Sequence, residues 1–303
     1  MTESFIDYTL SRIAEQNPLH FKKVRKNLRK MGQEQGFEKQ AKEFYDKYDS
    51  FLSELGKNRE YAVDSYLRMI TDVMVETVAF ENTGEYTSKS FEEVNQRVYA
   101  NPLIMDYYMH GLLMSQFLWT HHFAVLQYYI TNLPKYKSEV RNYLEVGGGH
   151  GLYVNEATRC FGSSADINVI DISETSLAMA RYFVESKKVN FIHSDVFKYF
   201  PERKYDFITM GEVLEHVEEP VALLKKLHEL LSESGTVFIT TPTNAPAIDH
   251  LYLFRNAADI HRVIDEAGFR VESELKVYAE DVPEELAEQL KITLMYAAFL
   301  KKK

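Results

Sequence analysis

Four glycines follow a short apolar run near the middle of the chain, and a glutamate stands just before them. The stretch reads YLEVGGGHGLYV over residues 143–154, with Glu145, Gly147, Gly149 and Gly151 at alternate positions. Glycines between a strand and a helix let backbone N–H groups approach a ligand closely. The dinucleotide pattern G-x-G-x-x-G fits no register of this loop, and the glutamate would be a poor neighbour for a pyrophosphate. The loop instead suits a ligand that carries an amine and a sulfonium cation.

Acidic residues also follow the next two apolar runs of the sequence. Asp171 closes the run Ile167–Ile170 and can accept hydrogen bonds from both hydroxyls of a ribose. Asp195 follows the third run, where its carboxylate can accept a hydrogen bond from an adenine amino group. After the fourth run comes MGEVLEHVEEP, residues 210–220. These marks together indicate a site for an adenosine-containing ligand.

The long loop after the fifth apolar run contains the best single candidate for a general base, which is His250. A neutral hydroxyl or amine acceptor usually needs such a base, whereas a carboxylate acceptor is already anionic and needs none. Asn244 and Tyr252 in the same loop are predicted to contact the acceptor. Glu212 and Glu215, after the fourth run, are expected at the surface or in local pairs.

A second group of candidates lies on a helix expected over residues 102–132. His122 stands seven residues beyond Ser115 and three beyond Trp119, so these three share one helical face, and Tyr108 precedes them. Their polar groups must either find partners in the core or face a pocket. In the second case this face lines the acceptor pocket, and His122 competes with the loop histidine as the base.

Two kinds of framework must position these residues. Over residues 1–135 the apolar residues recur every three or four positions, which predicts a domain made of helices. Over residues 136–303 short β-branched runs alternate with helical segments, which predicts a parallel sheet covered on both faces. The strands are expected at residues 141–146, 167–171, 189–193, 207–210 and 236–240, with two more nearer the C-terminus.

The composition excludes several functional classes. The chain has 303 residues and a net charge of −10, which argues against nucleic-acid binding because phosphates need a basic face. Cys160 is the only cysteine, so no disulfide framework can form within the chain, and we predict a cytoplasmic protein. Residues 107–130 lack formal charges but contain too many polar side chains for a membrane span. The histidines show no metal-ligand spacing with carboxylates, so no metal site is predicted.

The ordered marks resemble the class I S-adenosylmethionine-dependent methyltransferases over roughly residues 140–300, and VLEHV at 213–217 is similar to their small-molecule branch. The resemblance implies a Rossmann-like, doubly wound α/β sheet of seven strands with the last strand antiparallel. S-adenosyl-L-methionine would be the cofactor and S-adenosyl-L-homocysteine the product. The cofactor-binding residues implied by the resemblance are Glu145, Gly147 and Gly149 for the methionine part, Asp171 for the ribose, Ile172, Asp195 and Val196 for the adenine, and the Gly211 carbonyl for the amine.

The leading functional hypothesis is O-methylation of a small or biosynthetic molecule of the natural-product type. Methylation of a carboxylate on a peptide or carrier-bound intermediate, N- or C-methylation, and cofactor binding without chemistry remain as alternatives. The helical domain would serve as a lid over the substrate or as a homodimer interface. Its basic run, residues 22–30, is expected to be a solvated face or a dock for an acidic partner such as a carrier protein. No nucleic-acid or membrane partner is expected.

Overall fold

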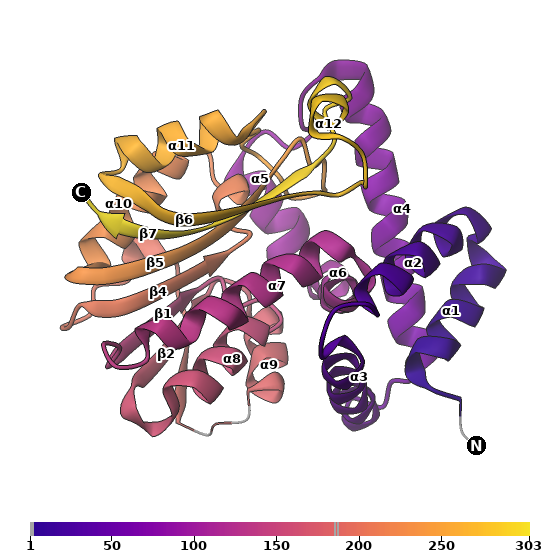
Figure 1. Cartoon of the computed structure of the whole chain (residues 1–303), viewed down its shortest axis with the longest axis horizontal. Helices are drawn as coiled ribbons and strands as arrows, with labels where there is room; N and C mark the ends of the chain where they lie inside the picture. Colours follow the sequence, from indigo (N-terminus) through magenta and orange to yellow (C-terminus); the bar gives the residue numbers. More distant parts are fainter. Residues whose placement is uncertain (1–2, 185, 187) are drawn as a thin grey trace.

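A group of helices lies beside a mixed sheet that is itself covered by helices on both faces (Figure 1). The computed structural model describes residues 3–184, 186 and 188–303. The N-terminal helices form one side of the molecule in this view, and the sheet with its covering helices forms the other. None of the described helices combines the length and the apolar character that a membrane span requires.

The sheet contains strands from the whole C-terminal part of the chain. In chain order the strands are β1 (Asn142–Val146), β2 (Asp166–Asp171), β3 (Val189–His193), β4 (Tyr205–Gly211), β5 (Leu231–Thr243), β6 (Phe269–Tyr278) and β7 (Leu294–Lys302). They form one seven-stranded sheet in the order β3-β2-β1-β4-β5-β7-β6. The first five strands pair in parallel, while β7 pairs antiparallel with both β5 and β6. The predicted doubly wound sheet with an antiparallel last strand is confirmed.

Neighbouring residues of a strand point to opposite faces of the sheet, and here both faces carry apolar side chains that helices bury. The covering helices are α7 (Thr120–Asn132), α8 (Leu152–Phe161), α9 (Glu174–Phe183), α10 (Pro220–Leu230) and α11 (Ala257–Glu266). Tyr143 of β1 belongs to the core under α7, α8 and α9, and its neighbour Leu144 belongs to the core under α10 and α11. The crossover helices therefore hold the carboxyl ends of β1, β2 and β4 at one edge, where a ligand site is expected.

The N-terminal helices pack on one another through aromatic and aliphatic side chains. They are α1 (Phe5–Gln16), α2 (Pro18–Met31), α3 (Phe37–Glu54), α4 (Arg59–Thr83), α5 (Phe91–Val94) and α6 (Pro102–Leu118). The last described helix, α12 (Glu284–Gln289), lies between β6 and β7. Phe44 of α3 stacks on Phe117 of α6 with ring centroids 4.3 Å apart, and on Phe183 of α9 at 6.2 Å. The helical part is thus joined to the sheet part by a continuous apolar core.

The single helix predicted over residues 102–132 is wrong, because the chain breaks it at Trp119. This residue has the extended conformation (φ −114°, ψ 127°) between α6 and α7. Its indole N–H donates to the Tyr66 hydroxyl of α4 at 2.7 Å. The break lets α6 pack on α4 while α7 packs on the sheet. A domain boundary near residue 135 stays a prediction. Helix α7 lies before that point in the sequence, yet it covers one face of the sheet.

Candidate active site

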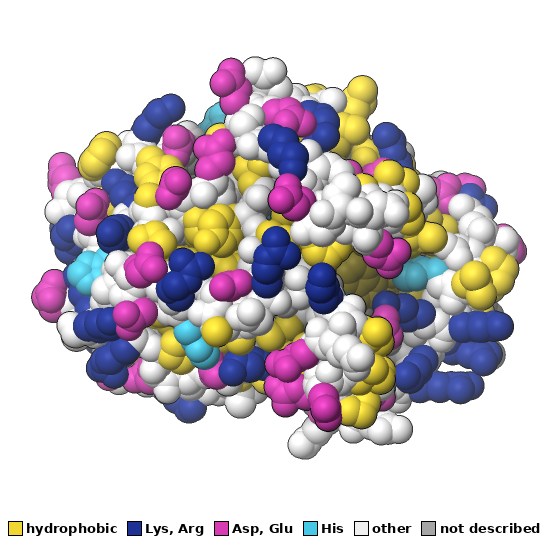
Figure 2. Space-filling view, turned by 90° about the horizontal axis from the view of Figure 1, so that it is seen from above, with side chains coloured by type: hydrophobic (Ala, Val, Ile, Leu, Met, Phe, Trp, Pro, Cys, Tyr) yellow, Lys and Arg dark blue, Asp and Glu magenta, His cyan; other side chains and the backbone are white. Residues whose placement is uncertain are grey.

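A cavity of about 490 Å³ lies between the carboxyl edge of the sheet and the helices α4 and α6. The part of its wall that α4 and α6 form is largely apolar and includes Met69, Ile70 and Val73 of α4 and Met105 and Leu112 of α6. Figure 2 shows a hollow with hydrophobic side chains at its base and with histidine, basic and acidic side chains near its edge. The cavity therefore has one polar wall, from the strand ends, and one apolar wall, from the helices.

The glycine loop after β1 forms part of the polar wall and adopts the left-handed conformation that favours glycine. The φ angles are +73° at Gly147, +49° at Gly149 and +78° at Gly151. A Cβ atom on Gly147 would lie 2.6 Å from Val213 Cγ2, which leaves no room for a side chain. A Cβ atom on Gly149 would make only ordinary van der Waals contacts, with Gly147 O at 3.8 Å and Met109 Cε at 3.9 Å. The loop thus presents bare backbone to the cavity, as the sequence predicted.

Two carboxylates lie at the ends of the adjacent strands β1 and β2 and line the cavity. Glu145 accepts a hydrogen bond from the Tyr143 hydroxyl at 2.9 Å. Asp171 accepts one from the backbone N–H of Gly149 at 3.1 Å and another from that of Ser173 at 2.8 Å. Burial raises the pKa of both Glu145 and Asp171, and these hydrogen bonds oppose the rise. Hydrogen bonds from a bound ligand would reduce the cost of keeping these buried groups charged.

The structure brings many of the predicted site residues to this one cavity. Those that line it are Tyr108, Trp119, His122, Glu145, Gly147, Gly149, Asp171, Ile172, Gly211 and His250. They come from α6, from the break before α7, from the start of α7, from the ends of β1, β2 and β4 with the segments that follow them, and from the loop after β5. Residues far apart in the sequence therefore share one site.

The predicted adenine contacts Asp195 and Val196 are not among the residues that line the cavity. Asp195 accepts a hydrogen bond from the backbone N–H of Phe197 at 2.9 Å, which caps a short turn after β3. Val196 is partly buried and packs against the core under α10 and α11. Their contact with an adenine therefore stays a prediction.

The predicted acceptor contacts Asn244 and Tyr252 do not line the cavity either. The Asn244 side-chain amide donates to the backbone carbonyl of Arg255 at 2.9 Å, and its backbone carbonyl accepts from Thr293 at the same distance. Tyr252 packs on Phe254 with ring centroids 4.8 Å apart. In this structure both residues hold the long loop in place, and that loop carries His250.

His122 reaches the cavity from the start of α7, and Ser115 lies behind it. Ser115 is fully buried, and its hydroxyl donates to the backbone carbonyl of Leu112 at 2.7 Å. The same hydroxyl oxygen lies 2.8 Å from His122 Nδ1, and the side-chain nitrogen of Gln116 lies 3.3 Å from that atom. Burial lowers the pKa of His122 to about 3, with a smaller contribution from His150. Ser115 orients the histidine although it does not itself line the cavity.

Glu215 is completely buried and lines the cavity, so its expected place at the surface is wrong. One carboxylate oxygen, Oε2, accepts a hydrogen bond from Thr241 at 2.8 Å. The other, Oε1, has no hydrogen-bond partner in the described part of the chain. Burial raises the pKa of Glu215 well above its usual value, and the nearby Glu212 adds to the rise. The residue was missed because its neighbours, Thr241 among them, come from a distant part of the sequence.

Glu212 also faces the cavity, directly after the end of β4. Its backbone has a positive φ of +54°, which is uncommon for a residue with a side chain. The Thr240 hydroxyl donates to Glu212 Oε1 at 2.6 Å, and the Glu212 N–H donates to the Thr240 carbonyl at 3.1 Å. Burial raises the pKa of Glu212 to about 7, although the hydrogen bond from the Thr240 hydroxyl lowers it. Its place right after a parallel strand was the sequence signal that could have identified it.

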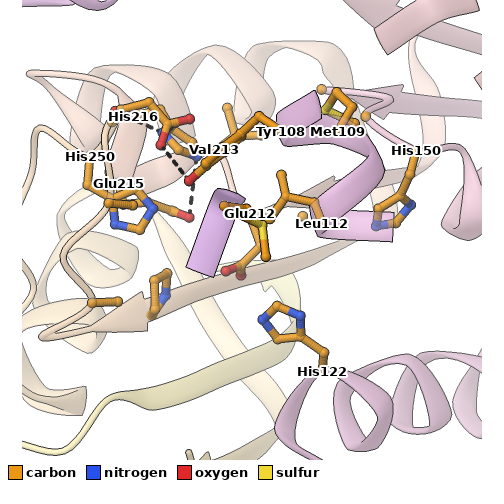
Figure 3. Close-up of a pocket in the computed structure, with 18 of the residues that line it drawn as sticks. Tyr108, Met109, Leu112, His122, His150, Glu212, Val213, Glu215, His216 and His250 are labelled. Atoms are coloured by element: carbon orange, nitrogen blue, oxygen red, sulfur yellow. Dashed lines mark hydrogen bonds and ion pairs between the residues drawn. The ribbon is translucent and has the colours of Figure 1, made fainter. Parts of the chain in front are cut away.

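Glu215, His216, Asp249 and His250 form a group at one end of the cavity, called the polar corner below. Figure 3 shows Glu215, His216 and His250 together, with His122 and His150 apart from them. The imidazole rings of His216 and His250 meet edge to face, with centroids 4.9 Å apart. His250 is buried, and its Nδ1 has no hydrogen-bond partner among the described residues. Burial lowers the pKa of His250 to about 4, and the nearby His216 makes a smaller contribution in the same direction. This imidazole is therefore neutral near pH 7.

Residues 118–274 match a protein family described as methyltransferase domain. The match covers more than half of the 303 residues, so the chain belongs to this family. Together with the sheet topology and the glycine loop, it defines a class I S-adenosylmethionine-dependent methyltransferase, with S-adenosylmethionine as its cofactor.

Curated relatives share shorter segments with this chain. Malonyl-[acyl-carrier protein] O-methyltransferase 1 of Ilyobacter polytropus is 33% identical over 101 residues, which are 33% of this chain and 37% of that protein. A ubiquinone biosynthesis O-methyltransferase of Aromatoleum aromaticum is 29% identical over 156 residues, 48% of this chain and 65% of that one. The chain thus spans less than two thirds of the length of either relative.

Among solved structures, the chain is similar to the mitomycin 7-O-methyltransferase MmcR. The TM-score is 0.53 with 11% sequence identity, and the superposition covers 77% of this chain and 68% of the other. At this identity the likeness supports the fold alone. Because the superposition extends beyond the 118–274 segment, part of the similarity lies outside the matched family domain.

Proposed function

We propose that this methyltransferase methylates an oxygen atom of a small, largely apolar biosynthetic molecule. The observation that supports the proposal is a single cavity that runs from the glycine loop to the polar corner, with an apolar wall from α4 and α6. A site of this kind holds a small molecule by apolar contacts and orients it with a few polar groups. Methyl transfer needs mainly proximity and orientation, which such a cavity supplies.

The polar wall near the glycine loop fits the cofactor. Asp171, at the end of β2, would accept hydrogen bonds from the ribose hydroxyls, and Ile172 would pack on the adenine. Glu145 and the backbone of Gly147 and Gly149 would hold the methionine part, together with the carbonyl of Gly211. These glycines and carboxylates all line the cavity, which is consistent with these roles. When bound, S-adenosylmethionine supplies a methyl group already activated by its sulfonium.

The polar corner would receive the reacting oxygen of the acceptor. Nδ1 of the neutral imidazole of His250 has no hydrogen-bond partner among the described residues, so it would accept the proton that a hydroxyl acceptor gives up as its oxygen takes the methyl group from the sulfonium sulfur. Tyr108 would help to place the acceptor, because it lines the cavity and its hydroxyl lies 3.4 Å from the carboxylate of Asp249. His122 is the second candidate for the base, because it lines the cavity and its lowered pKa keeps the imidazole neutral near pH 7.

The test uses methyl-labelled S-adenosylmethionine, an extract of the source organism and mass spectrometry of the labelled product. The proposal predicts label on an oxygen of a small molecule. His250→Ala should lower turnover by about 10²-fold or more while affinity for S-adenosylhomocysteine stays near normal. His122→Ala, which removes the second candidate base, serves as the comparison variant. Label found only on nitrogen or carbon, or on no molecule, would contradict the proposal.

A second candidate is methylation of a carboxylate on a carrier-bound intermediate. Two curated relatives are named malonyl-[acyl-carrier protein] O-methyltransferases. Helix α2 supports this alternative, because His20 and Lys23 line the cavity and the helix exposes a run of basic side chains at 22–30. An acidic carrier could dock on that run and send its acyl chain into the cavity.

Base dependence separates these two candidates. A carboxylate acceptor needs no proton removal, so a carboxylate methyltransferase would keep most of its activity in the double variant His250→Ala, His122→Ala. Charge reversal at Arg25 and Arg29 would then weaken activity on a carrier-bound acyl group but not on the same acyl group bound to a short thiol. Equal activity on both acceptors after charge reversal would count against a carrier dock.

The helical part is proposed to act as a lid over the acceptor. Lys23 of α2 pairs with Glu280 at 2.5 Å, and Lys30 pairs with Asp281 at 3.2 Å, which joins α2 to the segment after β6. Ala279 next to this segment lines the cavity, as Lys23 does. These exposed ion pairs are weak individually, so the contact can open without a large cost. A role of the same helices in a homodimer and a cytoplasmic location both stay predictions.

A further inference from the structure

Three side chains of the polar corner bring potential metal-ligand atoms near one another. One donor atom each from Glu215, His216 and His250 lies within 4.8 Å of the other two. Glu215 Oε1 and His216 Nε2 are 3.7 Å apart, which is too long for a hydrogen bond between them. The two side chains thus lie close together without satisfying one another.

Two of these donor atoms are buried and unsatisfied. Glu215 Oε1 and His250 Nδ1 have no hydrogen-bond partner among the residues that the structure describes. The exposed fractions are 0% for Glu215 and 8% for His250. Buried polar groups are nearly always paired, and buried charges are paired or coordinate a metal. A ligand that accepts both the carboxylate oxygen and the imidazole nitrogen as donor atoms would satisfy the two groups at once.

His216 has the tautomer that metal binding requires. Its Nδ1 lies 3.0 Å from the backbone carbonyl of Asp249, and a carbonyl can only accept, so Nδ1 carries the hydrogen. Nε2 then has its lone pair free on the side of Glu215. A histidine that binds a metal typically donates its other ring N–H to a carbonyl or a carboxylate in this way. Glu215 is oriented similarly, because Thr241 holds its second oxygen at 2.8 Å.

We propose that Glu215, His216 and His250 bind a divalent transition-metal ion of the zinc type. Two imidazoles and one carboxylate are a common ligand set for such ions, and three protein ligands leave a position open for another molecule. The open position would face the cavity, so the acceptor's oxygen would bind the ion. Only the binding of the acceptor's oxygen to the ion rests on the proposed function. A bound ion would also take the lone pair of His250 Nδ1, so this imidazole would be a ligand and not the base.

The test uses the full chain, stripped with a chelator and dialysed. Zinc chloride is titrated by calorimetry, and cobalt chloride is titrated by visible absorption, which reports the ligand geometry. The expected result is one ion per chain and cobalt bands typical of a four-coordinate site. Glu215→Gln and His250→Ala should each weaken zinc binding by about tenfold or more. Circular dichroism checks that each variant is folded, and if neither folds, the cobalt spectrum of the unaltered protein decides.

The matched control is His261→Gln, which removes an exposed histidine that also lies close to a carboxylate. His261 Nε2 is 2.6 Å from Glu274 Oε2, outside the cavity. This variant should bind zinc as the unaltered protein does. Absence of stoichiometric binding, or binding that Glu215→Gln and His250→Ala leave unchanged, overturns the proposal.

The failure of this proposal can be told from the failure of the proposed function. Methyl transfer to oxygen by a protein that binds no ion would overturn the metal site and leave His250 as the proton acceptor. Zinc binding that depends on Glu215 and His250, in a protein that methylates only nitrogen or carbon, would support the metal site and contradict the proposed function. The two measurements are made on the same preparation.

Discussion

At the scale of single residues, Asp171 is the side chain on which the proposed cofactor contact depends most directly. Its carboxylate lines the cavity and already accepts hydrogen bonds from two backbone N–H groups of neighbouring loops. Asp171→Ala should therefore weaken binding of S-adenosylhomocysteine at least about tenfold, which corresponds to about 1.4 kcal/mol. Isothermal titration calorimetry measures the change.

Asp166→Ala is the matched control for that variant, because Asp166 is an exposed aspartate at the opposite end of the same strand. It should bind the product with unchanged affinity. If both variants bind alike, the ribose contact assigned to Asp171 is incorrect.

The residues of the cofactor wall could be predicted from the sequence because they are local to their motifs. Glu145, Gly147 and Gly149 lie within five positions, and Asp171 directly ends a strand. The polar corner could not be predicted in this way. Glu215 is buried through a contact with Thr241, and His216 is oriented by the backbone of Asp249, 33 positions later in the chain. Only the tertiary structure brings these segments together.

At the scale of elements, Gly151 controls the join between the glycine loop and the helix α8. Its φ is +78°, and a Cβ atom there would lie 2.7 Å from Ala180 Cα on α9. Gly151→Ala should cost about 2 kcal/mol or more of the free energy of unfolding, since strained backbone and overpacking add. The loop must also shift, so affinity for S-adenosylhomocysteine should fall. Urea unfolding and calorimetry measure the two effects.

Gly84→Ala separates the backbone strain from the steric clash. Gly84 ends α4 with a φ of +72°, but a Cβ atom there would meet nothing within 4 Å. This variant should cost about 1 kcal/mol and leave ligand affinity unchanged. Equal losses of stability in the two variants would show that the contact with α9 does not constrain the loop.

The elements themselves were predictable where their signals are local. Asn101 followed by Pro102 starts α6 as expected, with the Asn101 side chain accepting from the Leu103 N–H at 3.1 Å. No glycine or proline in the sequence marks the break at Trp119. It follows from packing, because α6 and α7 contact different parts of the molecule and the indole is bonded to Tyr66. A periodic sequence pattern cannot reveal such a break.

At the scale of the whole molecule, buried groups titrate with opposite effects on stability. Burial raises the pKa of Glu145 and Glu215, which favours the folded state at low pH. Burial lowers the pKa of His110 to about 4, although its ordinary value is about 6.5. The unfolded chain therefore binds a proton at His110 that the folded chain does not, so the contribution of this residue falls as the pH drops from about 6.5 toward 4.

The variant His110→Asn isolates that contribution from the opposing carboxylates. His110 is fully buried, and its Nδ1 lies 2.7 Å from the Tyr48 hydroxyl. The stability difference between the unaltered protein and the variant should be larger at pH 7.5 than at pH 5, by about 1–2 kcal/mol. Urea unfolding at the two pH values measures it. A difference that is constant or grows at pH 5 would show that the folded protein protonates this histidine normally.

The account as a whole depends on where the cofactor lies, and a crystal structure of the complex with S-adenosylhomocysteine tests this most directly. We predict electron density along the carboxyl edge of the sheet, with the ribose hydroxyls on the Asp171 carboxylate and the homocysteine end beside Glu145 and the glycine loop. The sulfur atom should point toward the acceptor side of the cavity, where the polar corner lies. Density at another place, or a saturated crystal in which this edge remains empty, would contradict the account.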